Sequence, residues 1–243
     1  MNSTRKTALV AGIFYLVSFI SIPTLFLYDS LKNHPDFIIS SGTNTGVLWG
    51  GLLEVVVALA GIGTAVTLFP VVKRQNEGMA LGFVATRTLE AAMIFTGVAS
   101  ILSLVTLHQD LGTATGANAA SLVTIGASHV ATYNWAFTVG QSLMPVANAV
   151  LLGTLMYRSG LVPRVIPVMG LIGAPLQLSA VILTMFGVID RTSVATGILV
   201  IPDFIWELSL GIYLVVKGFK PCPITDAMRA ADTPPAYRDV VVS

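Results

Sequence analysis

Six stretches of the chain are each about 20 residues or longer and contain few charged residues. A helix that crosses a bilayer needs about 20 consecutive, mostly apolar residues, so each stretch is long enough to span a membrane. The first stretch follows Arg5 and Lys6, as in a signal peptide, but it is longer than a signal peptide's apolar region and no A-x-A cleavage site follows it. We therefore expect it to be retained as a helix. The six predicted spans are residues 8–28, 46–70, 79–107, 128–156, 164–189 and 194–217.

The composition indicates what surrounds these spans. Only 10% of the 243 residues are charged and 54% are hydrophobic, whereas a soluble domain carries about 25% charged residues. The predicted surroundings are therefore a lipid bilayer, and the predicted fold is an all-α, polytopic membrane protein with six transmembrane helices in a bundle. A net charge of +1 and the lack of a basic stripe argue against a nucleic-acid partner. Cys222 is the single cysteine, which excludes an intramolecular disulfide and a CxxC site.

Lysine and arginine residues predict the orientation. Cytoplasmic loops of membrane proteins carry an excess of these residues. If six spans alternate in direction, Lys32 and Arg191 fall on one side and ten basic residues fall on the other. Both termini are then predicted to be cytoplasmic, in a multi-pass protein of the inner (cytoplasmic) membrane. The ten are Arg5, Lys6, Lys73, Arg74, Arg158, Arg164, Lys217, Lys220, Arg229 and Arg238.

The chain divides into a transmembrane domain, residues 1–218, and a cytoplasmic tail, residues 219–243. The tail contains four prolines and mixed charge, a composition typical of disorder. Cys222 lies at its start, either as a free thiol or as a site for palmitoylation. On the outer side, residues 108–127 are rich in small residues; they either lie on the membrane surface or extend the fourth span outward.

Five ionisable residues fall well inside the predicted spans. A charge at the centre of a membrane helix costs about 2.5–3.5 kcal/mol on insertion scales, so such residues face the bundle interior and mark a functional site or a structural ion pair. Arg87 and Glu90 are three residues apart and can pair on one helix face. The Arg87 guanidinium can also hold a second carboxylate. The five are Glu54, Arg87, Glu90, Asp203 and Glu207.

Counting these charges gives one cation against four carboxylates. The excess negative charge calls for protons, a bound cation or a hydrated cavity, which is the strongest functional indication in the sequence. Span four adds three neutral polar residues, Asn134, Gln141 and Asn148, spaced seven apart on nearly one helix face. Gln177 in span five can join them. Such residues either line a binding cavity or hydrogen-bond neighbouring helices together.

Prolines and small residues predict how the helices bend and pack. Pro23, Pro145, Pro167, Pro175 and Pro202 lie inside predicted spans, and each leaves a backbone carbonyl without its helical partner. In a bilayer such carbonyls need another donor or a hydrated cavity. Close helix contact in lipid depends on small residues, found here at Gly46-xxx-Gly50, Gly78-xxx-Gly82 and Gly170-xxx-Ala174.

Several catalytic and cofactor motifs are missing from the sequence. It contains no HExxH, P-loop or GxGxxG motif, which argues against a zincin-type protease and a nucleotide site. The histidines His34, His108 and His129 lie in or beside outer loops, and none has a second ligand four residues away. The spans lack a buried lysine for a retinal Schiff base and paired histidines for haem. No cofactor is indicated, and the sequence does not define a metal site.

Four segments resemble bacterial membrane proteins grouped as domain of unknown function 4386. They are ALVAGIFYLVSFI at the start, Glu54 in span two, RTLEAA in span three and WELSLGIYLVVKGFKP at the end. The resemblance covers roughly residues 5–221 and implies a six-helix protein with the Arg-x-x-Glu of Arg87 and Glu90, and with Glu207 before an aliphatic stretch ending in Lys217-Gly218-Phe219. It implies no activity. Asp203 lies outside the matching positions.

Taken together, these features predict a membrane protein with a buried acidic cavity that takes a small-molecule or ion ligand, as in a small proton- or cation-coupled transporter. The expected lining residues are Glu54, Arg87, Glu90, Asp203, Glu207, Gln141, Asn134 and Asn148. Two alternatives stay open: a membrane-embedded enzyme acting on a lipid-like substrate, and a structural or regulatory membrane subunit. The sequence does not define the ligand, the oligomeric state or an inverted repeat between the two halves.

Overall fold

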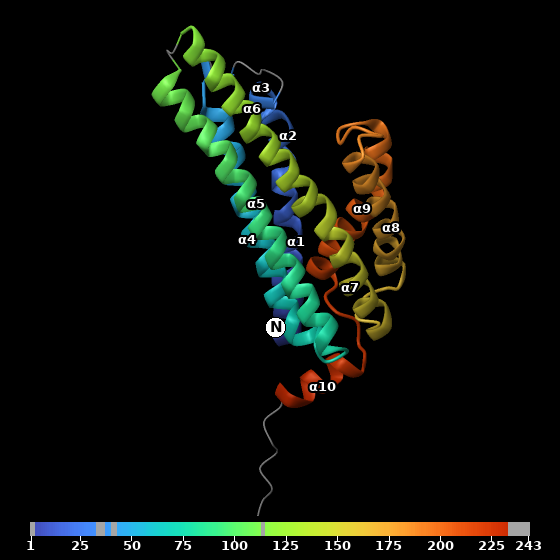
Figure 1. Ribbon diagram of the computed structural model, residues 1–243. Helices are drawn as coiled ribbons and strands as arrows, with labels where there is room; N and C mark the ends of the chain where they lie inside the picture. The colour runs from blue at the N-terminus through green and yellow to red at the C-terminus, as the bar shows by residue number, and fades with distance from the viewer. Residues whose placement is uncertain (1–2, 33–36, 40–42, 113–114, 233–243) are drawn as a thin grey trace, which may run out of the picture.

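The computed structural model describes residues 3–32, 37–39, 43–112 and 115–232, and these residues form helices without any strand (Figure 1). Five helical stretches in this part of the chain are long and apolar enough to cross a membrane. They correspond to predicted spans two to six, and the fourth begins earlier than predicted. The stretches are α4 (Thr45–Val72), α5 (Glu77–Leu111), α6 (Ala117–Phe137) joined to α7 (Met144–Ser159), α8 (Val165–Met185) and α9 (Val194–Val216).

The first predicted span is divided into short pieces. Helix α1 (Ser3–Val17) continues into a 3-10 helix, η1 (Ser18–Ser21), and α2 (Thr24–Leu27) and α3 (Asp29–Lys32) follow it. The division falls around Pro23, which has no backbone N–H to donate. Ile22 instead donates to the Phe19 carbonyl, in the tighter 3-10 pattern. No single helix here is long enough to cross a membrane by itself.

Span four is longer than the sequence predicted. Helix α6 begins at Ala117, so most of segment 108–127 is helical and extends this span outward, the second of the two expectations for it. A π-helix, η3 (Thr138–Leu143), joins α6 to α7 just before Pro145. Gln177 on α8 donates from Nε2 to the Ser142 carbonyl at 2.8 Å. A carbonyl within this irregular turn thus finds a donor on the neighbouring helix, as bilayer surroundings require.

The helices form a closed ring. Helix α1 packs against α4 and α9, α4 packs against α5, and α5 packs against both α6 and α7. Helix α7 packs against α8, and α8 packs against α9, which completes the circuit. Helices α5 and α9 therefore lie opposite each other. Figure 1 shows the long helices running along the molecule, with α10 and the start of α1 at the same end.

Glycines allow the closest contacts in this ring. A Cβ added at Gly12 on α1 would lie 2.8 Å from the Gly211 carbonyl oxygen and 2.8 Å from the Val215 nitrogen on α9. A Cβ added at Gly173 on α8 would lie 2.8 Å from the Asp203 nitrogen on α9. The predicted Gly170 position also faces α9, where an added Cβ would lie 2.7 Å from the Trp206 ring. Helix α9 is thus held against both neighbours through backbone contact.

The end of the bundle that carries α10 and the start of α1 is called the basic end here. Arg5 donates from Nη1 to the Leu214 carbonyl at 2.8 Å and from Nη2 to the Val215 carbonyl at 2.6 Å. These bonds satisfy carbonyls at the end of α9, which have no partner within the helix.

The C-terminal tail is partly helical: residues 219–243 are predicted to lack regular structure, but Pro223–Asp232 form helix α10. Residues 233–243 lie outside the described part of the chain.

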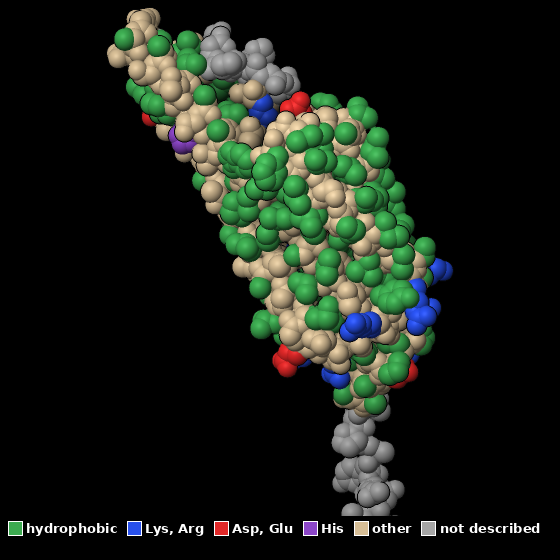
Figure 2. Space-filling view, turned by 45° about the vertical axis from the view of Figure 1, so that its right-hand side comes forward, with side chains coloured by type: hydrophobic (Ala, Val, Ile, Leu, Met, Phe, Trp, Pro, Cys, Tyr) green, Lys and Arg blue, Asp and Glu red, His purple; other side chains and the backbone are tan. Residues whose placement is uncertain are grey.

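Apolar side chains cover the outside of the bundle. In Figure 2 hydrophobic side chains spread over the middle of the molecule, and lysine and arginine side chains gather toward its lower end. Large apolar residues on the outward faces, among them Leu59, Val66, Leu81 and Ile212, are exposed. Apolar patches of this extent on a helical bundle suit contact with lipid. The chain is therefore a membrane-embedded helical protein.

Candidate functional site

A cavity of about 780 Å³ lies inside the ring, within the range of volumes typical of ligand pockets. Residues from η1, α2, α3, α4, α5, α6, the π-helix, α7, α8 and α9 line it. Toward the basic end it is closed by a packed core that includes Phe83, Leu152, Leu210 and Leu214. The cavity therefore has a closed end inside the bundle and an end formed by Lys32, Arg191 and the start of α9.

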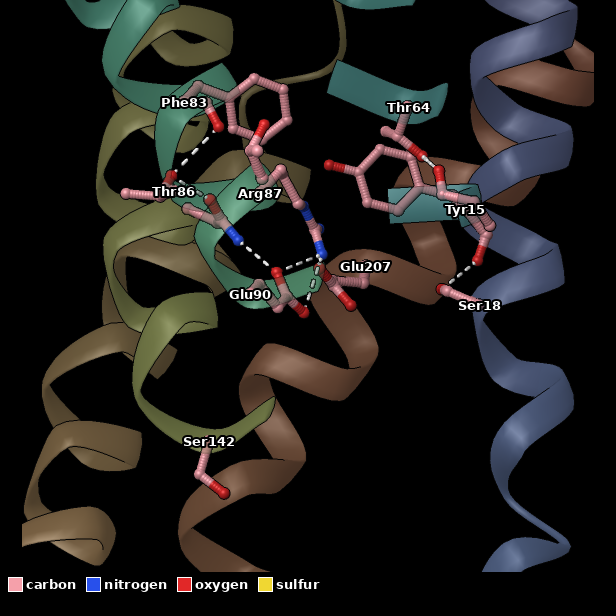
Figure 3. Close-up of polar contacts among 12 residues, drawn as sticks. Tyr15, Ser18, Thr64, Phe83, Thr86, Arg87, Glu90, Ser142 and Glu207 are labelled. Atoms are coloured by element: carbon pink, nitrogen blue, oxygen red, sulfur yellow. Dashed lines mark hydrogen bonds and ion pairs between the residues drawn. The ribbon is translucent and has the colours of Figure 1, made fainter. Parts of the chain in front are cut away.

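Arg87 is the centre of the closed end. Its Nη1 lies 3.3 Å and 3.1 Å from the two carboxylate oxygens of Glu90, one turn away on α5. Its Nη2 donates to Oε1 of Glu207 on α9, across the ring. Figure 3 shows the guanidinium pointing between these carboxylates, with Tyr15 of α1 nearby. The predicted Arg87–Glu90 pair is confirmed, and Arg87 does hold a second carboxylate.

Glu90 is fixed from a third helix. Asn148 on α7 donates from Nδ2 to Oε2 of Glu90 at 2.8 Å. The amide oxygen of Asn148 accepts a hydrogen bond from the Thr86 hydroxyl, so its orientation is set as well. Glu90 therefore has partners on two sides and is held in place by α5 and α7 together.

Asp203 is the exception among the acids of the closed end. It lies one turn before Glu207 on α9, lines the cavity and is only 6% exposed. Its Oδ1 is buried without a hydrogen-bond partner among the described residues. Five buried side-chain atoms in the described part of the chain lack a partner, and three of them, Asp203 Oδ1, Arg87 Nε and Arg191 Nη1, belong to residues that line this one cavity. Arg87, Glu90, Asp203 and Glu207 are called the floor of the cavity below.

Glu54 lies apart from the floor. It is 1% exposed and does not line the cavity. Its carboxylate accepts hydrogen bonds from the Tyr133 hydroxyl at 2.7 Å and from the Tyr28 hydroxyl at 3.4 Å. The two tyrosine rings meet edge to face, with centroids 5.4 Å apart. Glu54 is thus bonded to two tyrosine hydroxyls, and Tyr133 itself forms part of the cavity wall.

Lys32 and Arg191 lie at the opposite end of the cavity, which is called the mouth below. Lys32 Nζ lies 4.5 Å from the centroid of the Tyr133 ring, and Arg191 Cζ lies 4.5 Å from that of Phe137. Arg191 also donates from Nη2 to Asn134 Oδ1 at 3.1 Å. Neither cation forms an ion pair with a residue that the structure describes.

Burial affects the acid–base behaviour of both mouth residues. The pKa of Lys32 is lowered to about 8, chiefly by burial and then by the charge of Arg191, while Glu54 acts in the opposite direction. Burial also lowers the pKa of Arg191. Partial burial of two neighbouring cations costs free energy, so an anionic group at the mouth would be stabilised.

The predicted site residues fall into two groups. Arg87, Glu90, Asp203, Glu207 and Gln141 line the cavity directly. The other three each bond to a residue that lines it, since Glu54 binds Tyr133, Asn148 binds Glu90 and Asn134 binds Arg191. Gln177 lines the cavity as well.

Lys32 and Arg191 are not among the residues predicted to line the site, because the sequence pattern places both in outer loops. Arg87 is consequently not the only cation near the four buried acids. The available signal was that these two are the only basic residues on the predicted outer side. With Lys32, Arg87 and Arg191 counted against Glu54, Glu90, Asp203 and Glu207, one net negative charge is left if all ionise.

Other candidate groups do not converge on the cavity. Among the residues that the structure describes, no three His, Cys, Asp or Glu side chains are placed to hold one metal ion. His108 contacts the Phe37 carbonyl through Nδ1, and His129 contacts the Ser100 hydroxyl. His34 lies outside the described residues. Cys222 is a half-buried free thiol beside Thr225 near the basic end.

These features define a class: a membrane-embedded helical bundle with a polar cavity enclosed by a ring of helices. Comparison with known families assigns the chain more narrowly. The model of a family described as domain of unknown function DUF4386 matches residues 10–218, and the chain belongs to this family. No similar curated protein and no similar solved structure was found. The family assignment confirms the resemblance seen in the sequence and brings no activity with it.

Proposed function

We propose that the chain crosses the membrane six times, with α1–α2 as the first crossing and both termini in the cytoplasm. The first crossing is supported by the position of α1, which packs in the ring between α4 and α9. The orientation is supported by the basic residues of the described chain, which lie toward the basic end apart from Lys32, Arg87 and Arg191. Residues 1–218 then form the transmembrane domain in the inner membrane, and residues 219–243 form a cytoplasmic segment containing α10.

The proposed function is binding of a small, positively charged solute in the cavity, as part of proton- or cation-coupled transport. One observation carries it: Asp203 presents a buried carboxylate oxygen, without a partner among the described residues, to an intramembrane cavity. A carboxylate in such surroundings needs a proton, a cation or a hydrogen-bond donor to offset the cost of burial. Arg87 does not bond to this oxygen: its Nη atoms contact Glu90 and Glu207, and its Nε is itself buried without a hydrogen-bond partner among the described residues.

The shape of the cavity favours transport over simple storage of a ligand. A solute that reaches Asp203 from the mouth has entered the bundle, and the packed core blocks its exit at the basic end. This is one half of an alternating-access cycle, in which a central site opens to one side at a time. The cation or proton on Asp203 and the neighbouring Glu207 would be exchanged as access changes.

The test uses octyltrimethylammonium, whose charge is permanent at every pH. Binding to the full chain in dodecyl maltoside is measured by calorimetry, and uptake is measured with the radiolabelled ion in proteoliposomes. Asp203→Asn should weaken binding about tenfold or more, because the variant removes the carboxylate charge. Asp226→Asn on the exposed helix α10 is the matched control. Equal binding and uptake by wild type and Asp203→Asn would overturn the proposal and leave a structural or regulatory role.

The described residues offer less support for an enzyme. A metal-dependent enzyme needs several converging ligands, and none of the described acids and histidines form such a group. The described Ser100–His129 contact lacks the acid that orients the histidine in a catalytic triad. Solute binding is therefore the function that the cavity supports best.

A further inference from the structure

The two ends of the cavity carry opposite net charge. At the mouth, Lys32 and Arg191 face one buried acid, Glu54, which gives a net charge of one positive unit when all three ionise. At the floor, Arg87 faces Glu90, Asp203 and Glu207, which gives two negative units in the same state. The cavity is therefore electrically polarised along the bundle.

Each end also presents an unused polar atom. Arg191 Nη1 is buried without a hydrogen-bond partner in the described part of the chain, although Nη2 of the same side chain bonds to Asn134. At the floor, Asp203 Oδ1 is likewise buried without a hydrogen-bond partner among the described residues. Buried polar atoms in proteins nearly always have partners. The floor also holds the unpaired Arg87 Nε beside this acceptor. A ligand with an anionic group at the mouth and a cationic group near Asp203 would give partners to Arg191 Nη1 and Asp203 Oδ1.

The start of α9 strengthens the preference for an anion at the mouth. Thr192, Ser193, Thr196 and Gly197, around the first turn of this 23-residue helix, line the cavity beside Arg191. The N-terminus of a helix carries a partial positive charge, which favours anions; here the Thr196 N–H is already bonded to the Ser193 hydroxyl. Arg191, Lys32 and this terminus thus act on the same part of the cavity.

The wall between the two ends is mostly apolar, with Gln141, Ser142 and Gln177 among its polar residues. It includes Phe19, Val57, Ile94, Phe137 and Val200. Ser193 at the mouth and Asp203 at the floor are ten residues apart, which is about 15 Å along the helix. The reach of the Arg191 and Asp203 side chains into the cavity shortens the gap that a ligand must bridge.

We infer that the cavity takes an elongated zwitterion, whose cationic group binds Asp203 and whose carboxylate or equivalent anionic group binds Arg191 and Lys32, with an apolar spacer between them. This inference rests on the proposed function for the cationic group and adds an anionic subsite at the mouth. A phospholipid headgroup does not fit this description, because its two charges lie too close together to reach both ends.

The experiment compares three probes in dodecyl maltoside: 8-(trimethylammonio)octanoate, octyltrimethylammonium and octanoate. The first carries both charges, and the others each lack one. The zwitterion should bind at least about tenfold tighter than either single-charge probe, since its carboxylate accepts charge-assisted hydrogen bonds at the mouth while its quaternary ammonium group forms an ion pair with Asp203 at the floor. Arg191→Gln and Lys32→Gln should remove most of that advantage while changing octyltrimethylammonium binding less than about twofold.

Two matched controls lie at the basic end. Arg164 stacks on Tyr157 at 5.4 Å and Lys73 lies over Phe69 at 5.3 Å, so each repeats the cation–aromatic contact of a mouth residue away from the cavity. Arg164→Gln and Lys73→Gln should leave all three affinities unchanged. Retained octyltrimethylammonium binding shows that the mouth variants are folded.

The outcomes separate this inference from the proposed function. If octyltrimethylammonium binding depends on Asp203 but the zwitterion binds no tighter, the anionic subsite is wrong and the cation site stands. If added phosphatidylethanolamine, whose two charges lie close together, competes with the zwitterion for binding, the inference that the ligand needs a long apolar spacer is wrong. If the wild type binds none of the three probes, both proposals fail.

Discussion

Arg87 on α5 and Glu207 on α9 form an ion pair across the ring, between two helices that are not neighbours in the circuit of packing contacts. Asn148 on α7 joins the same network through Glu90. Three helices are thus joined by one buried network of an ion pair and hydrogen bonds, and the packed core on the basic side begins where this network ends. The network links the stability of the ring to the chemistry of its cavity.

Arg87→Ala should lower the thermal midpoint of the purified protein strongly, because it leaves Glu90 and Glu207 buried without their cation. Removal of one partner from a buried ion pair costs about 3–5 kcal/mol. The thermal midpoint of Arg87→Lys should lie between those of the wild type and Arg87→Ala, since one ammonium group replaces two separate Nη contacts. Arg164→Ala at the exposed basic end is the control. If Arg87→Ala and Glu207→Gln had fully additive effects on stability in a double mutant, the two groups would not be coupled as described.

Gly12→Ala should destabilise the bundle by separating α1 from α9. The added Cβ would lie 2.8 Å from both the Gly211 oxygen and the Val215 nitrogen, and backbone atoms cannot move aside as a side-chain end can. The same change at Gly197 on α9 meets no atom within 4 Å and should be neutral or slightly stabilising, because alanine favours the helix by up to about 1 kcal/mol. Thermal unfolding in detergent measures both. An equal response at the two positions would contradict the close α1–α9 packing.

Tyr133→Phe should destabilise the protein by about 1.5–3 kcal/mol, the range for a hydrogen bond to a charged group. The change keeps the ring that contacts Lys32 and removes the 2.7 Å bond to Glu54. Tyr157→Phe on the exposed surface of α7 is the control. Chemical denaturation measures the effect of Tyr133→Phe in the wild type and again in a Glu54→Gln background. If the effect vanishes in that background, the charge on Glu54 is the reason; an unchanged effect would refute that account.

The spans were predictable from sequence because their length and polarity are local properties. The bounds of α4, α5, α8 and α9 lie close to the apolar stretches 46–70, 79–107, 164–189 and 194–217. The Arg87–Glu90 pair was predictable for the same reason, since three-residue spacing on a helix fixes their proximity. The first span was less predictable because the helix is divided around Pro23 into pieces whose path depends on packing.

The mouth was not predictable from sequence. Lys32 and Arg191 are 159 positions apart and approach each other only because the ring closes between α1 and α9. The separation of Glu54 from the floor was not predictable either, because it too depends on how segments distant in the sequence pack together. Its partners, Tyr28 and Tyr133, come from distant segments, and no spacing within span two indicates that two tyrosines enclose the carboxylate.

The proposed topology predicts opposite accessibility for two cysteines. Cys222 lies at the basic end beside α10, and Thr192 lies exposed at the mouth. In intact cells, a membrane-impermeant maleimide should label Thr192→Cys in a Cys222→Ser background and should leave the native Cys222 unlabelled until the membrane is opened. Detergent-solubilised protein serves as the control for reactivity at both positions. Labelling of both in intact cells, or of Cys222 alone, would reverse or refute the orientation.

The affinity for 8-(trimethylammonio)octanoate should fall about threefold to tenfold as the pH rises from about 7 to about 9. The pKa of Lys32 is about 8 in the folded protein, below its usual value, so the cation that favours the ligand's carboxylate is present below about pH 8 and is lost above it. The groups facing Lys32 are Arg191, Glu54, Tyr28 and Tyr133. The ligand's own charges do not titrate in this range. Lys32→Gln should bind more weakly at pH 7 with a flat profile, and octyltrimethylammonium should show a flat profile with the wild type. A wild-type affinity for the zwitterion that is constant across this range would show that Lys32 does not contact the anionic group.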